Sequence, residues 1–366
     1  MYTLSRRYSM YVGTYTHGKS KGIYIFDFDA ISGKLELKGV SSELENPSYL
    51  CVSKNSKYLY AVMEVGEFQG EAGGAVGAYS IDSRTGLLKL INIQPTKGKD
   101  PCHLSTDSTG KYLFAANYSE GTFSVYPIGR DGQIDTISFI IRHMGSGPNK
   151  ARQEEPHVHY VALTPDEKYL CAVDLGIDKI NIYSFTLKDG CPAIEENLPV
   201  TVKPGSGPRH MVFHPNSGFA YLLTELSSEV IAFEYNCHIG AFNQIQCITT
   251  LPAGLKGTNY CAAIHISPCG KFLYSSNRGH DSIALFRIIQ ASGRLEPVSH
   301  IPTRGSFPRD FAIDPTGRFL FAANQDSDTI IPFAIMPDSG LLEQTGDIME
   351  IPDPVCIKVI GPASEK

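Results

Sequence analysis

A unit that recurs about every fifty residues constrains this chain more than any other feature of its sequence. Six complete copies align on the turn that precedes their second apolar run. The copies begin at Asn46, Asp100, Glu155, Gly207, Asn259 and Phe307. A fixed period of this size is typical of solenoids and propellers. Residues at the same position in each copy are therefore expected to lie at the same height on the same face.

Each copy reads as a set of short β-strands. The apolar runs are rich in Val, Ile, Tyr and Phe and are bounded by Gly, Pro, Asn and Asp, as in PTGRFLFAANQ (315–325). A further strand per copy is expected after turns such as those in SGKLELKGV (32–40), TGLLKLINI (85–93) and SGRLEPVSHI (292–301). No segment shows sustained helical spacing with caps, so we expect little helix.

Four short antiparallel strands repeated around an axis predict an all-β fold, a β-propeller. Residues 11–29 resemble the second and third strands of a copy without its first, and residues 353–360 form an isolated first strand. The two chain ends complete each other, which predicts seven blades and a ring closed by pairing 355–360 with 11–15. A solenoid is the alternative, but it would need polar caps rather than two halves of one unit.

The composition sets limits on the class of protein. By length alone, 366 residues would suggest two domains, but the repeat predicts one domain over residues 1–366. Hydrophobic residues make up 42% of the chain, enough for a large core, and the lack of Trp argues against a Trp-Asp repeat propeller.

Charge and hydropathy patterns indicate which partners to expect. A net charge of −6 argues against a nucleic-acid partner, which needs a basic surface. No apolar run is long enough to cross a membrane, and the first residues lack a signal-like apolar stretch. The nine cysteines are scattered and form no C-x-x-C pair. We therefore expect reduced thiols, no membrane partner and a cytosolic location.

Two columns of residues stand out when the copies are aligned. The first lies where the chain enters the first strand: Ser48, Cys102, His159, Arg209, Ala262 and Arg309. The second lies where the second strand ends: Glu64, Tyr118, Leu175, Glu225, Arg278 and Gln325. Because the two strands are antiparallel, both columns should face one mouth of the central channel. His159, Arg209, Glu225 and Arg278 then fall on three consecutive blades and should converge.

This combination suits acid–base chemistry on an anionic substrate. A His and a Glu can transfer protons, and two Arg can bind an anion and stabilise a developing oxyanion. The alternative is a set of structural salt bridges at the rim. We expect the catalytic residues to be His159, Arg209, Glu225 and Arg278, and the substrate-binding residues to be His103, Arg152, His157, His210 and Arg309.

Other sites are less well supported by the sequence. His157 and His159 could begin a metal site, but no third ligand is in register, so we expect no metal and no cofactor. His103 and His210 share a column and could equally be core residues. The sequence holds no H-E-x-x-H motif and no G-x-G-x-x-G dinucleotide-binding motif.

With these residues in view, the chain resembles the seven-bladed propeller lactonases, which include propeller-type 6-phosphogluconolactonases and carboxy-cis,cis-muconate lactonising enzymes. The resemblance covers nearly the whole chain. It is carried by YVGTYT (11–16), DPCHLS (100–105), RQEEPHVH (152–159), GPRH (207–210), SNRG (276–279) and FPRDF (307–311), among others. The active site proposed for that family, a His, an Arg, a Glu and an Arg, falls on His159, Arg209, Glu225 and Arg278, with His157 as an alternative position for the His.

The resemblance implies a lactone hydrolase, with 6-phosphoglucono-δ-lactone as the expected substrate. Either Glu225 or His159 would activate water, and the other would protonate the leaving ring oxygen. Two alternatives stay open: a muconolactone-type cycloisomerase, and a propeller that binds a ligand or protein without catalysis. A fold by itself does not decide between them.

Overall fold

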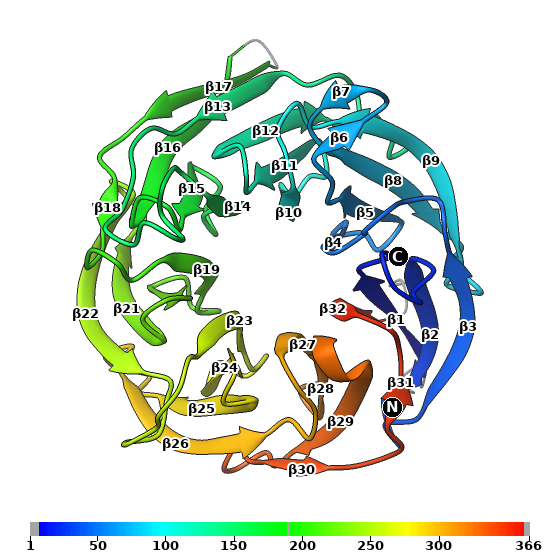
Figure 1. The fold of residues 1–366 in the computed structure, drawn as a ribbon, viewed down its shortest axis with the longest axis vertical. Coiled ribbons are helices and arrows are strands. Elements are labelled where there is room, and N and C mark those ends of the chain that lie inside the picture. Colours follow the sequence, from blue (N-terminus) through cyan, green and yellow to red (C-terminus); the bar gives the residue numbers. More distant parts are fainter. Residues whose placement is uncertain (1–6, 189–190, 362–366) are drawn as a thin grey trace.

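The computed structural model describes residues 7–188 and 191–361, which form seven sheets around a central axis (Figure 1). Blade 1 contains β32 (Pro354–Ile360), β1 (Arg7–Thr14), β2 (Ile23–Asp29) and β3 (Leu35–Ser41); blade 2 contains β4 (Leu50–Val52), β5 (Tyr58–Met63), β8 (Ala75–Ile81) and β9 (Leu88–Pro95); blade 3 contains β10 (Pro101–Thr106), β11 (Tyr112–Asn117), β12 (Thr122–Pro127) and β13 (Phe139–Arg142). The first strand named in each blade is the innermost, and each neighbour in the series is antiparallel.

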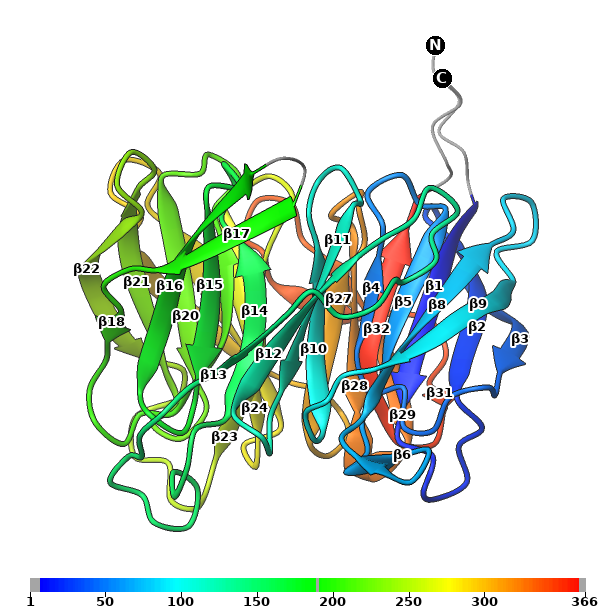
Figure 2. The same ribbon diagram turned by 90° about the horizontal axis from the view of Figure 1, so that it is seen from above.

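The other four blades follow the same order. Blade 4 contains β14 (Val158–Leu163), β15 (Tyr169–Asp174), β16 (Lys179–Lys188) and β17 (Cys191–Glu196); blade 5 contains β19 (Pro208–Phe213), β20 (Phe219–Thr224), β21 (Glu229–Asn236) and β22 (Ala241–Thr249); blade 6 contains β23 (Tyr260–Ile266), β24 (Phe272–Arg278), β25 (Ser282–Ile288) and β26 (Leu295–Pro302); blade 7 contains β27 (Pro308–Ile313), β28 (Phe319–Asn324), β29 (Thr329–Ile335) and β30 (Leu342–Gln344). The seven-bladed, four-stranded prediction is confirmed. Figure 2 shows the ring from the side, with strands running between its two faces.

The ring closes as the sequence predicted. The strand β32 lies beside β1 in antiparallel register, with Ile357 opposite Val12 and Lys358 opposite Tyr11. Blade 1 therefore takes its innermost strand from the C-terminal part of the chain and its other three from the N-terminal part. This pairing leaves neither end of the ring with an open inner edge.

Three blades depart from the simple pattern. In blade 4 the outer edge is shared by β17 and β18 (Val200–Thr201), and in blade 7 by β30 and β31 (Met349–Glu350). Pro199 and Gly346 lie in the interruptions, and both residue types weaken a ladder. Blade 2 carries an extra hairpin, β6 (Glu67–Phe68) and β7 (Glu71–Ala72).

Helix is scarce, as predicted. In the part of the chain that the structure describes, the one helix is the 3₁₀ turn η1 (Gln325–Ser327). Among the same residues no helix has the length and apolar character needed to cross a membrane.

The core lies in the wedges between blades rather than in one central mass. Each buried apolar cluster contains residues of two adjacent blades: Phe28 of blade 1 meets Phe321 of blade 7, and Phe114 of blade 3 meets Leu170 of blade 4. Alternate residues of each strand point to the two neighbouring wedges. Each blade thus depends on both neighbours for its burial.

A repeated hydrogen bond ties adjacent blades together. Tyrosines in second strands donate to a glycine carbonyl in a turn of the next blade: Tyr11 to Gly86, Tyr60 to Gly132, Tyr221 to Gly293 and Tyr274 to Gly340. At Gly293 the φ angle is 67° and an added Cβ would lie 2.3 Å from the Phe219 ring. The turn glycine is therefore needed for both conformation and space.

Candidate active site

A β-bulge aims the first column of residues at the channel. In blades 3, 4, 5 and 7 the register between the first and second strands shifts at one position. The residues left without a partner across the ladder are Cys102, His159, Arg209 and Arg309. A bulge re-aims its extra side chain. The same backbone irregularity therefore places one side chain from each of these blades at the same mouth.

The second column is fixed by one repeated backbone bond. The N–H of Glu225 donates to the Gly207 carbonyl at 2.7 Å, and the N–H of Tyr118 donates to Asp100 at 3.0 Å. These residues directly follow the second strands. Both columns thus meet at the end of the channel where first strands begin, as the sequence predicted.

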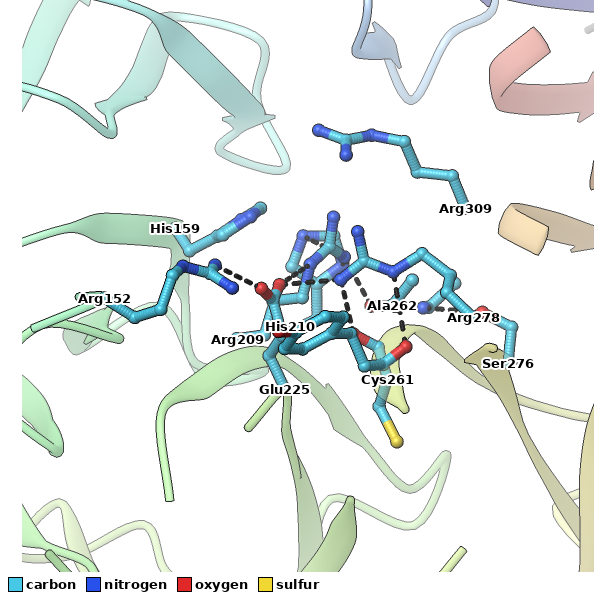
Figure 3. Close-up of polar contacts among 12 residues, drawn as sticks. Arg152, His159, Arg209, His210, Glu225, Cys261, Ala262, Ser276, Arg278 and Arg309 are labelled. Carbon is cyan, nitrogen blue, oxygen red and sulfur yellow. Dashed lines mark hydrogen bonds and ion pairs between the residues drawn. The ribbon is translucent and has the colours of Figure 1, made fainter. Parts of the chain in front are cut away.

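Glu225 is the centre of the cluster (Figure 3). Its Oε2 atom lies 3.0 Å from Nε of Arg209 and 2.8 Å from Nη2 of Arg278, and its Oε1 atom lies 2.5 Å from Nη2 of Arg152. Three elements supply the guanidinium groups: a bulge in blade 5, the end of β24, and the segment between blades 3 and 4. The carboxylate is 4% exposed, so these ion pairs are largely shielded from water.

The arginines are themselves anchored to backbone. Arg278 donates from Nη2 to the Cys261 carbonyl at 3.0 Å, and its guanidinium lies over the Phe307 ring. Arg209 donates from Nη1 to the Ala262 carbonyl. Such contacts fix the planes of both guanidinium groups.

Electrostatics keeps this centre ionised. Burial alone would raise the pKa of Glu225, but Arg278, Arg209, His159 and Arg152 together hold that pKa well below its usual range. Burial and the neighbouring Arg278 lower the pKa of Arg209 to about 10, which leaves it protonated at neutral pH. Glu225 is therefore a permanent carboxylate and a weak base.

His159 is a neutral imidazole beside this network. Its ring is 5% exposed, packs edge-on against His210 and Tyr118, and places Nδ1 3.6 Å from the Cys102 sulfur. Burial, and then the charge of Arg209, lower the pKa of His159 well below the ordinary histidine value. A neutral histidine next to cations is available to accept a proton.

The structure places the predicted substrate-binding residues in different layers. Arg152 joins the Glu225 network and is also the most exposed of its guanidinium groups, at 32% of its side chain. His157 stacks on Tyr118 with ring centroids 4.4 Å apart, and its Nδ1 lies 3.1 Å from the Tyr118 carbonyl. His210 contacts Nη1 of Arg209 through its ring.

His103 lies one layer deeper than the mouth. Its ring packs between Tyr49 and Tyr160, with centroids 4.5 and 4.4 Å away, and it lines the cavity at the other end of the channel. This position supports the alternative that His103 is a core residue and does not bind substrate.

A second carboxyl group sits on the opposite side of the mouth. Glu64 in blade 2 accepts hydrogen bonds from Tyr15, at 2.9 Å, and from Ser48. Arg309 donates to the same Tyr15 hydroxyl at 2.8 Å. Burial raises the pKa of Glu64. Glu64 lies in the second column, but the sequence does not single it out, because its burial and its contact with Tyr15 of blade 1 depend on the packing of the ring.

A small cavity joins the two groups. It has a volume of about 10 Å³ and is lined by Glu64, Arg209, His210 and Arg309, among others. In Figure 3, Arg309 lies apart from the dashed network and extends over it. The mouth therefore combines four guanidinium groups with two carboxyl groups in contrasting environments.

The sequence predicted no metal site. Within the described ranges, no group of three His, Cys, Asp or Glu side chains is placed to hold an ion. The eight cysteines whose side chains are described are free. The absence of a metal requirement stays a prediction.

These observations define the protein as a seven-bladed β-propeller with a buried, arginine-held carboxylate and a buried histidine at one mouth. Comparison with known families identifies which one. The chain belongs to the family "Lactonase, 7-bladed beta-propeller", whose model matches residues 9–359.

Named relatives agree with this family. The chain is 42% identical over 308 residues to the 6-phosphogluconolactonase of Bacillus subtilis, covering 84% of this chain and 85% of that protein. It is 38% identical to the 6-phosphogluconolactonase of Formosa agariphila, covering 83% and 86%. Among solved structures, the periplasmic gluconolactonase of Pseudomonas aeruginosa superposes with a TM-score of 0.92 at 35% identity, covering 97% and 99%.

Proposed function

We propose that the protein is a lactonase that hydrolyses 6-phosphoglucono-δ-lactone to 6-phosphogluconate. The names of the Bacillus and Formosa relatives support this substrate. The observation that carries the proposal is the charge arrangement at the mouth. Four guanidinium groups face two carboxyl groups there, which favours an anionic ligand, and a neutral imidazole lies beside them.

In this proposal His159 is the general base. It takes a proton from water as the water oxygen adds to the lactone carbonyl carbon. The resulting oxyanion is stabilised by the free N–H groups of Arg209 and Arg278, which are already oriented by Glu225 and backbone carbonyls. Collapse of this intermediate breaks the bond to the ring oxygen, which leaves with a proton, and the product is a carboxylic acid that ionises.

Glu225 then has a positioning role rather than a proton-transfer role. Its pKa lies well below the usual carboxyl range because guanidinium groups surround it, so it is a poor match for proton transfer at neutral pH. Glu64, whose pKa is raised by burial, is the better donor to the leaving ring oxygen. Two carboxyl groups with opposite pKa shifts commonly divide such roles. Arg152 and Arg309 would hold the phosphate.

A second candidate substrate has a specific observation in its favour. The Pseudomonas relative is described as a gluconolactonase, without a phosphate in its name. The same relative is described as periplasmic, and the cytosolic location of this chain stays a prediction. The family model and the names of the relatives favour lactone hydrolysis over the cycloisomerase and non-catalytic alternatives.

The test is turnover of 6-phosphoglucono-δ-lactone and of glucono-δ-lactone, each corrected for spontaneous hydrolysis. We expect kcat/KM to be much higher for the phosphorylated lactone, and we expect EDTA to leave both rates unchanged. Equal kcat/KM for the two lactones would favour the unphosphorylated substrate class. If the protein accelerates the hydrolysis of neither lactone, the mouth would be a binding site and not an active site.

A further inference from the structure

Four aromatic rings divide the central channel into two ends. Tyr49, His103, Tyr160 and His210 each follow the first-column residue of their strand, in blades 2, 3, 4 and 5. Their centroids lie 4.5 Å apart for Tyr49 and His103, 4.4 Å for His103 and Tyr160, and 5.4 Å for His103 and His210. Packed rings of this kind leave little space between them. The far end of the channel lies beyond this layer, where the first strands end.

That far end holds a cavity of about 500 Å³. Tyr49, His103 and Tyr160 line it on the side of the aromatic layer, and residues further along the first strands form its wall. This volume falls within the usual range for small-molecule sites. The cavity is much larger than the space found among Glu64, Arg209 and Arg309.

The charged groups in this wall are basic. Lys358 and His265 line the cavity, whereas no Asp or Glu is among its lining residues. Asp310, which pairs with His265 Nε2 at 3.5 Å, is buried behind the wall and also accepts the N–H of Ile357 at 2.9 Å. A ligand that enters the cavity contacts the Lys358 ammonium group and the His265 ring directly, and the Asp310 carboxylate lies behind them.

The ammonium group of Lys358 has hydrogen-bond donors without a partner among the residues that the structure describes. Its Nζ lies 4.4 Å from the centroid of the Tyr49 ring. With the residues that the structure describes, it makes no hydrogen bond and no ion pair within 4.0 Å. A lysine has three N–H donors, and leaving them unpaired in a partly buried site is unfavourable. An anionic oxygen in the cavity would satisfy them.

We propose that this cavity is a second binding site, for a small metabolite that carries a phosphate or carboxylate group. Lys358 supplies the charge, His265 lies within the same wall as a further donor, and the faces of Tyr49 and Tyr160 pack against the carbon skeleton of the ligand. The proposal stands whether or not the enzyme hydrolyses the phosphorylated lactone, because none of His159, Glu225 and the four arginines of the mouth lines this cavity.

Occupancy of this site should also strengthen ring closure. Lys358 lies on β32, the strand that joins the two ends of the chain, and the other walls come from β4, β10, β14, β23 and β27. A ligand that binds only the folded protein raises its stability in proportion to the logarithm of ligand concentration. A ligand here would contact blade 1 and, at the same time, blades on the other sides of the channel.

The experiment measures the binding of inorganic phosphate and of citrate by calorimetry, at constant ionic strength set with NaCl. The wild type is compared with Lys358→Met, with Lys271→Met as a matched control at an exposed turn, and with Arg152→Ala to report on the catalytic mouth. We expect Lys358→Met to weaken at least one anion tenfold or more and to leave lactonase kcat/KM unchanged. Lys271→Met and Arg152→Ala should retain that binding event.

Two results would overturn the proposal. One is equal affinity of Lys358→Met and Lys271→Met for both anions. The other is loss of all binding in Arg152→Ala, which would assign the measured heat of binding to the catalytic mouth.

If Lys358→Met does not fold, His265→Ala and a phosphate-soaked crystal of the wild type provide the test instead. Weaker binding and density beside Nζ of Lys358 support the site, and unchanged binding with no density rejects it. The preference between phosphate and citrate identifies the anionic group.

Discussion

At the scale of single residues, two carboxyl groups in the same repeat position have opposite environments. Glu225 contacts three guanidinium groups, and Glu64 contacts two hydroxyl groups. The first pKa is depressed and the second is raised. Position in the repeat thus brings both to the mouth, while the neighbouring blades decide what each can do.

Replacing Glu225 by Gln tests the positioning role. The change leaves Arg152, Arg209 and Arg278 without a counter-charge, so we expect a loss of stability of about 3–5 kcal/mol, the scale for breaking a buried ion pair. Because the folded pKa is depressed, this contribution is present above the unfolded carboxyl pKa of about 4.3 and is lost as pH falls through the folded value. Urea unfolding at pH 7 and at pH 3 measures it.

The kinetics of the same variant are equally informative. We expect kcat to fall by about 10²–10³-fold, as when an oxyanion-stabilising group is displaced. Glu120→Gln, which removes a surface pair with Arg142, is the matched control and should change little. Full turnover in Glu225→Gln would mean that the arginine network is dispensable for catalysis.

The pH profile tests His159 as the base. Since burial lowers the pKa of His159 well below the ordinary value of about 6.5, its neutral form persists below that pH, and kcat/KM should stay constant through pH 6.5 and decline only at lower pH. We expect His159→Gln to lower kcat by about 10²–10⁴-fold and to abolish this acid limb. A wild-type profile that already declines through a pKa of about 7 would contradict a neutral buried base.

The Glu64→Gln variant should change the alkaline side of the pH profile of activity. If a protonated Glu64 assists the leaving group, activity declines as pH rises above its raised pKa, and the variant loses this alkaline limb together with about 10²-fold in kcat. Tyr15→Phe, which removes one hydrogen bond to Glu64 and keeps its carboxyl group, should shift the limb and not remove it. If the pH profile of Glu64→Gln is unchanged, Glu64 is not the proton donor, and His159 would itself donate the proton to the leaving ring oxygen.

At the scale of strands and blades, the bulges and the tyrosine bonds give the ring its regularity. In blades 3, 4, 5 and 7 a bulge at the first-column position turns one side chain toward the axis, which a regular strand would place in a wedge between blades. The tyrosine bonds then fix the spacing of neighbouring blades.

Tyr221→Phe tests one of these bonds between blades. The hydroxyl donates to Gly293 at 2.8 Å and the side chain is fully buried, so its removal should cost about 1 kcal/mol in unfolding free energy. Tyr58→Phe is the control, because its analogous bond to Arg130 is exposed and water can replace it. A shift in the denaturant midpoint of equal size in both variants would argue against a special role for the buried bond.

At the scale of the whole molecule, stability depends on the joint between the chain ends. The strand β32 supplies Cys356 and Ile357 to the wedges on either side of blade 1 and its backbone to β1. Its removal exposes the inner edge of β1 and opens two wedges at once.

Truncation before Pro354 should therefore lower the melting temperature by far more than any single substitution named here, and the open edge of β1 should promote association. Scanning calorimetry and sedimentation measure the two effects. Lys358→Met, which keeps β32 and its backbone pairing, is the control. A truncated chain that melts like the wild type would show that the ring does not need its closing strand.

Much of this organisation was readable from the sequence. The period, the alternating apolar runs and the two incomplete ends were sufficient for a closed seven-bladed ring, because each is a local pattern repeated along the chain. Register alone brought His159, Arg209, Glu225 and Arg278 to one mouth. These predictions depended on position within a repeat, which the sequence states directly.

The functional contrast between sites came only from the tertiary structure. Whether Glu225 is a base, whether Glu64 takes part, and which side of the aromatic layer His103 serves all depend on side chains that arrive from other blades. A pKa reflects burial and charges within a few ångströms, and for Glu225 those neighbours range from Arg209, 16 residues away in the sequence, to Arg152, 73 residues away. The sequence determined where the polar groups would gather, and the packing of seven blades decided how each group is charged.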